Sequence, residues 1–163
     1  MSKVGVVYYS RTGHTEAMAT EVGVGVKEEG VELELKQAEE TELDDLLKWD
    51  GIIVGSPTYY GLLAAPIKEL FDRSVKYHGN LNGKVGGAFA SSGNVGGGNE
   101  TTVLSIIQMM LIHGMLVKGT PDGDHYGPVS VGNPTEKVKS ECRALGKRVA
   151  GLVKVLSSSE AVV

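Results

Sequence analysis

Short apolar runs recur along the chain at intervals long enough to hold a helix. The first, residues 3–9 (KVGVVYY), is continuous rather than alternating, which is typical of a strand buried on both faces. The later runs cover residues 31–36, 51–55, 85–91 and 115–117. Residues 129–131 are a candidate continuation of the last strand. Strands that alternate with helices indicate a parallel α/β sheet, and these units are too few for an eight-stranded barrel. We therefore expect an open, doubly wound sheet.

Several segments between the runs carry the apolar spacing of helices. In the last helix the stripe consists of Val138, Cys142, Leu145, Val149, Leu152 and Leu156. In a helix that begins near Ala65-Pro66 it consists of Ile67, Leu70, Phe71 and Val75. The first helix is expected although Gly23 and Gly25 each cost about 1 kcal/mol in a helix interior. We expect one domain over residues 1–156 and a loose tail over residues 157–163.

Composition narrows the classes of partner and compartment. The net charge is −4, and the 16 basic residues are scattered, which argues against nucleic acid as a partner. The single cysteine, Cys142, excludes a disulfide within the chain and lies in the apolar stripe, so we expect a buried residue rather than a catalytic thiol. No signal peptide, membrane insertion or metal site is predicted, and the expected location is the cytoplasm.

Hydroxyl and imidazole side chains gather in the loop after the first strand. The loop contains Ser10, Arg11, Thr12, Gly13, His14 and Thr15. Before a helix, such hydroxyls and the backbone N–H groups can donate several hydrogen bonds to a phosphate. The alternative is an ordinary turn in which serine and threonine cap the helix. The lysine of GxxxxGK[ST] and the three glycines of GxGxxG are missing, so we expect neither a nucleoside triphosphate nor a conventional dinucleotide.

Two further loops follow strands that end at the same edge of the predicted sheet. The second loop contains Pro57, Thr58, Tyr59, Tyr60 and Gly61. Its adjacent aromatics are placed to face a flat ring, or else they only cover the end of the sheet. The third loop contains Ser91, Ser92, Gly93, Asn94, Gly96, Gly97 and Gly98. Its bare N–H groups can bind a ligand edge or a developing negative charge, unless the loop is merely flexible.

These loops in this order, followed by His113-Gly114-Met115 and Tyr126-Gly127-Pro128, resemble those of the flavodoxin-like FMN proteins. The sequence is most similar to the WrbA-type NAD(P)H:quinone oxidoreductases, over nearly the whole chain. The resemblance implies a flavodoxin-like three-layer α/β sandwich. Its five-stranded parallel sheet would have the order 2-1-3-4-5, with helices on both faces, and its ligand would be FMN.

The resemblance also implies a role for each loop. The first loop would hold the FMN phosphate, with Arg11 as the nearest cation. The second would line one side of the isoalloxazine ring, and the third would surround its pyrimidine end and the ribityl chain. His113 matches a family histidine that approaches the flavin from a neighbouring subunit or an adjacent loop, and a helix-terminal cap is the alternative for it.

Two classes of function fit these residues. In an enzyme, NADH or NADPH would pass a hydride to flavin N5, and a quinone would then receive two electrons. In a carrier flavodoxin, single electrons would pass between protein partners. The moderate charge and the absence of an aromatic residue from residues 93–98 favour the enzyme. A phospho-receiver domain is excluded because Ser10 and Ser56 stand where it would need acidic residues.

The fourth helix predicts an assembly. Residues 103–112 are apolar almost all round, which indicates burial on two sides, so we expect a homodimer or homotetramer. The chain is shorter than typical WrbA-type proteins between its second and third strands and near residues 118–125. Those segments contribute to assembly and to the substrate entrance in the family.

Overall fold

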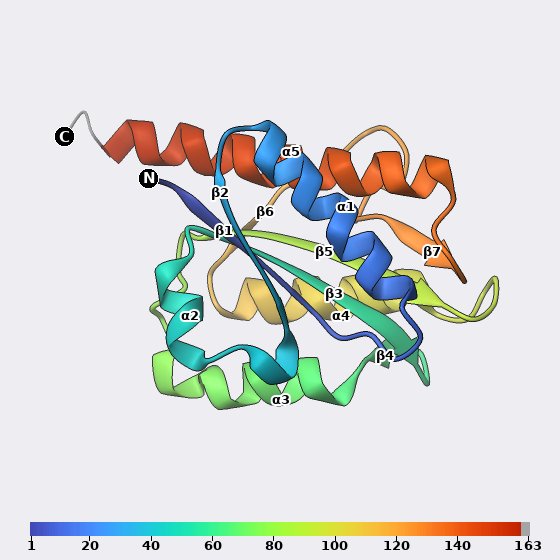
Figure 1. The fold of residues 1–163 in the computed structure, drawn as a ribbon. Helices are drawn as coiled ribbons and strands as arrows, with labels where there is room; N and C mark the ends of the chain where they lie inside the picture. The colour runs from blue at the N-terminus through green and yellow to red at the C-terminus, as the bar shows by residue number, and fades with distance from the viewer. Residues whose placement is uncertain (161–163) are drawn as a thin grey trace.

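A seven-stranded sheet runs through the centre of the computed structural model, which describes residues 1–160 (Figure 1). Its main path consists of β2 (Glu32–Gln37), β1 (Lys3–Tyr8), β3 (Gly51–Tyr59), β5 (Val85–Ser92) and β6 (Leu116–Val117), all parallel to their neighbours. Two short strands lie off this path. They are β4 (Leu62–Leu63), antiparallel to β3, and β7 (Val129–Val131), parallel to β5.

The open parallel sheet agrees with the sequence, but its strands differ from the predicted five in the order 2-1-3-4-5. The hairpin strand β4 is an addition that the sequence does not predict. The edge position of the sheet beside β5 is shared by two short strands. Strand β6 pairs with Val85 and Gly86 at the start of β5, and β7 pairs with residues 90–92 at its end. The chain between β6 and β7 leaves the sheet as a loop.

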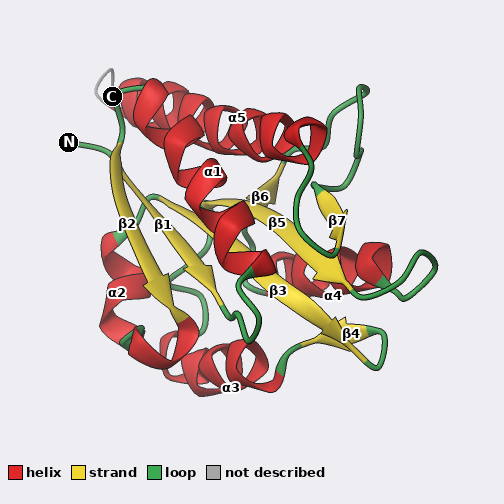
Figure 2. Ribbon diagram, turned by 45° about the vertical axis from the view of Figure 1, so that its right-hand side comes forward, coloured by secondary structure: helices red, strands yellow, loops and turns green. Residues whose placement is uncertain are grey.

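Helices cover both faces of the sheet (Figure 2). One face carries α1 (His14–Glu28) and α5 (Glu136–Glu160). The other carries α2 (Leu43–Lys48), α3 (Ala65–Arg73) and α4 (Asn99–Ile112). Short 3₁₀ helices, η1 (Ala38–Glu40) and η2 (Ser74–Tyr77), follow β2 and α3. This is the three-layer arrangement expected from alternating strands and helices.

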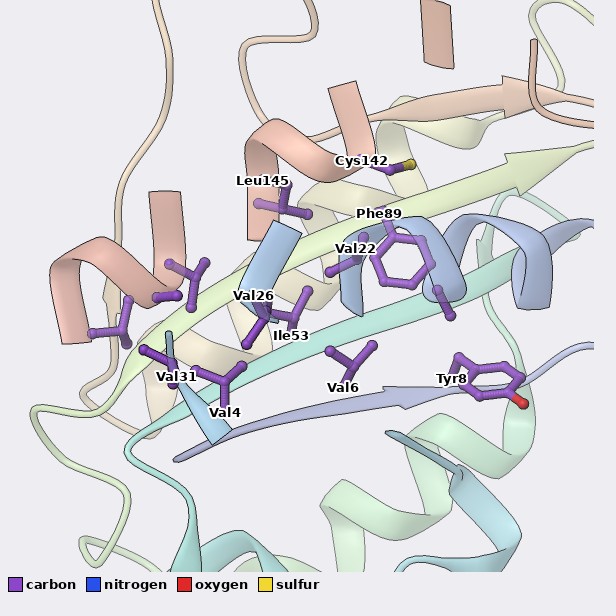
Figure 3. Packing of buried hydrophobic residues seen from close by; sticks show 14 of the residues in the cluster. Val4, Val6, Tyr8, Val22, Val26, Val31, Ile53, Phe89, Cys142 and Leu145 are labelled. Atoms are coloured by element: carbon purple, nitrogen blue, oxygen red, sulfur yellow. The ribbon is translucent and has the colours of Figure 1, made fainter. Parts of the chain in front are cut away.

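The central strands bury side chains on both faces. On β1, Val4, Val6 and Tyr8 pack under α1 and α5 (Figure 3), whereas Val7 belongs to the core on the opposite face. Successive side chains of a strand point to opposite faces, so a continuous apolar run suits a strand that is covered twice. The apolar pattern of residues 3–9 therefore has a direct structural cause.

Gly25 in α1 and Gly146 in α5 lie where these two helices pack against each other. A Cβ at Gly25 would lie 2.0 Å from the carbonyl oxygen of Arg143, and one at Gly146 would lie 2.1 Å from that of Val22. The backbones of α1 and α5 thus approach too closely for any larger residue. The helix-propensity cost of Gly25 is offset by this contact.

Cys142 agrees with its prediction as an apolar core residue. Its side chain is fully buried between α5 and the sheet (Figure 3). Burial raises the pKa of the Cys142 thiol to about 12, which keeps the sulfur protonated and unreactive near neutral pH.

Two other helical expectations need correction, for Val75 and for residues 157–160. Val75 lies beyond α3 in η2, where it is 72% exposed. The fourth helix buries one side within its own chain, since Met110 packs in the core while Ile112 is 76% exposed, and burial of its second side by another copy stays a prediction. Residues 157–160 are not a loose tail, because α5 continues through them and the hydroxyls of Ser158 and Ser159 donate to the carbonyl of Val155. No glycine or proline follows Leu156 to end the helix. Residues 161–163 of the predicted tail lie outside the described residues.

We predict opposite effects for glycine-to-alanine substitutions at two helical positions. Gly25→Ala forces α1 and α5 apart and should lower the free energy of unfolding by about 1–3 kcal/mol. Gly151→Ala in α5 meets nothing within 4 Å, so it should raise that free energy by roughly 0.5–1 kcal/mol through helix propensity. Urea unfolding of both variants measures the difference. Equal effects would show that the close approach of α1 and α5 does not limit stability.

Candidate functional site

The three predicted loops meet at one edge of the sheet. They follow β1, β3 and β5, which are neighbours and parallel, so their carboxyl ends lie side by side (Figure 2). Between the loops is a cavity of about 500 Å³, within the range that small-molecule sites occupy. It is lined by Arg11, Thr12, His14, Thr15, Pro57, Thr58, Tyr59, Ser91, Ser92, Gly93 and Gly132.

The first loop leaves the amino end of α1 without a capping side chain. Gly13 occupies the N-cap position with φ +93°, and its N–H donates to Ser10 Oγ at 3.1 Å. The first N–H groups of a helix have no partner within the helix, and they carry partial positive charge. Because no side chain caps α1, these groups are available to an anion at the floor of the cavity. The alternative of a serine or threonine cap is therefore contradicted.

Thr15 links the first loop to the third. It is 1% exposed, and its Oγ1 lies 2.9 Å from Ser91 Oγ. Ser92 is also engaged, because its hydroxyl donates to the carbonyl of Asn94 and accepts from the side chain of Asn99. These bonds fix the end of β5 against α1 and the start of α4.

The second loop is a tight hairpin between β3 and β4. Its two turn residues, Tyr60 and Gly61, have φ values of +50° and +80°, a pairing that usually calls for Asn-Gly or a similar dipeptide. Tyr60 is fully exposed in this unfavourable conformation. Tyr59 packs edge-on against Tyr9, with ring centroids 6.4 Å apart. Burial and Tyr9 raise the pKa of Tyr59, and the charge of Arg11 opposes them.

The structure therefore brings only part of the predicted site to the cavity wall. The predicted residues that do not line it are Ser10, Gly13, Tyr60, Gly61, Asn94, Gly96, Gly97 and Gly98. Ser10 and Gly13 support the first loop through their mutual hydrogen bond. Most of the third loop extends into solvent, with residues 93–97 exposed. Gly132, after β7, lines the cavity although no pattern in the sequence indicates it.

His113 lies far from this cavity. It follows the carboxyl end of α4, whereas the third loop precedes the amino end, and a helix of 14 residues spans about 20 Å. The residue is only 7% exposed, so its ring has almost no surface to offer another subunit. The position of His113 at the C-cap of α4 fits the structural alternative, and a catalytic role toward the flavin of another subunit stays a prediction.

The hydrogen bonds of His113 define its tautomer. The hydroxyl of Ser74 donates its one proton to the carbonyl of Phe71 at 2.6 Å, so it must accept from His113 Nε2 at 2.9 Å. The Nδ1 atom is then an acceptor, and within the described residues it is the one buried side-chain N or O atom without a partner. Burial lowers the pKa of His113, and the neighbouring His78 lowers it further.

Clusters of metal ligands and membrane-spanning helices are both absent from residues 1–160. No group of three or more His, Cys, Asp or Glu side chains in that range is arranged to hold a metal ion. Of the helices in the same range, none is both long enough and apolar enough to cross a membrane.

Comparisons with known proteins agree with this geometry. The sequence model of the flavodoxin family matches residues 6–100. A flavodoxin of Aquifex aeolicus (strain VF5) is 43% identical, over 95% of this chain and 89% of that protein. An NAD(P)H dehydrogenase (quinone) of Azorhizobium caulinodans is 37% identical, over 80% of this chain and 76% of that protein. The crystal structure of a flavodoxin, WrbA-like protein from Agrobacterium tumefaciens superimposes with a TM-score of 0.82 at 27% identity. The match covers 94% of this chain and 98% of that chain.

The chain therefore belongs to the flavodoxin family. It is a flavodoxin-like flavoprotein, and among the members of that family it resembles the WrbA-type proteins. The flavodoxin-like fold predicted from the three loops is confirmed.

We predict that His113 makes the stability of the protein depend on pH. Its lowered pKa means that the unfolded chain binds more protons as the pH falls below about 6.5, so the stability that His113 contributes is present above that pH and is lost as the pH falls through the lowered pKa. His113→Gln keeps a donor for Ser74 and should flatten this loss, by at most about 1.4 kcal/mol per pH unit. Denaturant unfolding at several pH values measures it.

The matched control is His125→Gln, because His125 lies exposed in the loop between β6 and β7. Identical slopes for the His113 variant and the unmodified protein would contradict the assignment.

Proposed function

We propose that the cavity binds FMN and that the protein is a cytoplasmic NAD(P)H-dependent reductase of quinones. The observation that carries the proposal is the uncapped amino end of α1 at the floor of a cavity that Tyr59 also lines. An anion suits the first feature, and a flat aromatic ring suits the second. FMN combines both in one molecule and carries a single phosphate group.

The first loop supplies the donors that a phosphate requires. The backbone N–H groups of the first turn of α1 would bind its oxygens, together with the hydroxyls of Ser10 and Thr12. The Ser10 hydroxyl already accepts from Gly13, so its own proton is left to donate. Arg11, which is exposed at the cavity and forms no ion pair in the described chain, would balance the negative charge.

The second and third loops would hold the ring. Pro57, Thr58 and Tyr59 form one wall, and Ser91, Ser92 and Gly93 form the other. When bound, FMN would supply hydride chemistry, accepting from the nicotinamide of NADH or NADPH and delivering two electrons to a quinone. The exposed third loop carries no aromatic side chain that could cover the cavity, which supports access for such substrates.

A carrier flavodoxin is the second candidate, and chain length favours it. The flavodoxin of Aquifex aeolicus matches this chain over 89% of its own length, whereas the NAD(P)H dehydrogenase of Azorhizobium caulinodans extends well beyond the matched region.

We also propose that the protein forms a homodimer or homotetramer. The apolar surface available for the contact is smaller than the one that the sequence predicts for residues 103–112. Met110 is buried within its own chain, and Met109 packs against the same core. The exposed apolar side chains at the end of α4 and in the following β6 are Leu111, Ile112 and Leu116. Any contact between copies through α4 would therefore use these three rather than the methionines.

Anaerobic mixing of the FMN-loaded protein with NADH or NADPH separates the two functions. A reductase should lose its visible flavin absorbance with at least one nucleotide much faster than free FMN does at the same concentration, because the site orients the two rings. Stopped-flow absorbance measures the rate, and dithionite serves as the control for a reducible flavin. Bleaching no faster than that of free FMN with both nucleotides would contradict the reductase and leave the carrier.

A further inference from the structure

Two threonines in the first turn of α4 contact the hairpin that forms one wall of the cavity. Thr101 Oγ1 lies 2.9 Å from the carbonyl oxygen of Gly61, at the hairpin tip. Thr102 Oγ1 lies 3.0 Å from Thr58 Oγ1, and Thr58 lines the cavity. Both hydroxyls also lie 2.9 Å from the carbonyl oxygen of Gly98, at the end of the third loop.

Counting protons shows that at least one of the two contacts to the hairpin is a hydrogen bond. The carbonyl of Gly98 already accepts the backbone N–H of Thr102 at 2.9 Å. A carbonyl oxygen has two lone pairs, so it can accept only one of the two threonine hydroxyls as well. If Thr102 donates to Gly98, Thr101 is left to donate to Gly61. If Thr101 donates to Gly98, Thr102 is left to donate to Thr58. In either arrangement a hydrogen bond crosses from α4 to the hairpin.

Packing supports the same link. Thr102 is fully buried, and a Cβ at Gly98 would lie 2.9 Å from Gly61 Cα. The hairpin tip therefore rests directly on the start of α4. Tyr60 costs energy in its left-handed conformation, and conformations of this kind persist only where the surroundings hold them. The close contact of Thr101 with the adjacent Gly61 provides such a hold.

We propose that Thr101 and Thr102 are positioning residues for the flavin site. Their hydroxyls fasten the hairpin wall to the amino end of α4 and so fix the distance between the walls formed by the second and third loops. This inference rests on the proposed function, because it assigns the two walls to the flavin. Neither threonine lines the cavity, so both act through Thr58 and Gly61. A ring that must fit between two walls binds less tightly when one wall can move.

Substitutions that remove a hydroxyl but keep the shape test the proposal. Thr101→Val should raise the FMN dissociation constant about five-fold, the value of one ordinary hydrogen bond. Thr101→Ser keeps the hydroxyl and should bind FMN like the unmodified protein. Thr102→Val should weaken binding in the same direction. Fluorescence titration of FMN into the apo protein measures each constant, and the apo melting temperature shows that each variant is folded.

Thr20→Val is the matched control. The Thr20 hydroxyl donates only within α1, to the carbonyl of Glu16 at 3.0 Å, so its loss should leave FMN affinity unchanged. If Thr101→Val binds FMN as tightly as the unmodified protein, the proposal is overturned. It is also overturned if Thr101→Ser loses as much affinity as Thr101→Val, because the methyl group and not the hydroxyl would then matter. Thr101 is exposed, so its variants test the proposal even if Thr102→Val does not fold.

Hydrogen exchange in the apo protein separates this proposal from the flavin assignment. The backbone amides of Leu62 and Leu63 should exchange faster in Thr101→Val than in the unmodified protein, whether or not FMN binds. If FMN fails to bind the unmodified protein but exchange still accelerates, the proposed function falls and the link between α4 and the hairpin stands. Unchanged exchange would overturn the link itself.

Discussion

The register between β1, β3 and β5 determines where each wall of the cavity begins. Tyr8 lies opposite Gly55, and Pro57 lies opposite Ser91, so the chain leaves three neighbouring strands at nearly the same level. A slip of one residue would turn every side chain of a strand to the other face. It would separate the buried hydroxyls of Thr15 and Ser91, and it would place apolar core residues at the ligand edge. The core packing and the site therefore depend on the same pairing.

The sequence predicts the fold well because burial on two faces leaves a clear apolar pattern. It predicts the position of the site because parallel strands bring their carboxyl ends to one edge. It does not predict which loop residues face inward. Tyr60 follows Tyr59 directly, but a turn with two positive φ values directs Tyr60 outward, and the dipeptide Tyr-Gly is not a usual signal for that turn. Similarly, β4 is only two residues long and carries no period to detect.

The residues that the sequence misses act through contacts between distant segments. Gly132 reaches the cavity because β7 pairs with the end of β5, and that pairing follows the irregular loop of residues 118–128. In the local sequence Thr101 and Thr102 look like ordinary residues of the first turn of a helix. Their contacts with residues 58–61 exist only in the folded chain. His113 is the reverse case. The resemblance places it near a flavin, whereas the length of α4 places it at the opposite edge of the sheet from the cavity of its own chain, so only the flavin of another subunit could meet it.

The central claim is that the amino end of α1 binds the phosphate of a flavin. Calorimetric titration of the apo protein with FMN and with riboflavin tests it most directly, because riboflavin differs only in lacking the phosphate. The account predicts that FMN binds at least about 100-fold more tightly, since two charge-assisted hydrogen bonds contribute on the order of 3 kcal/mol or more. Equal affinity for the two flavins would contradict it.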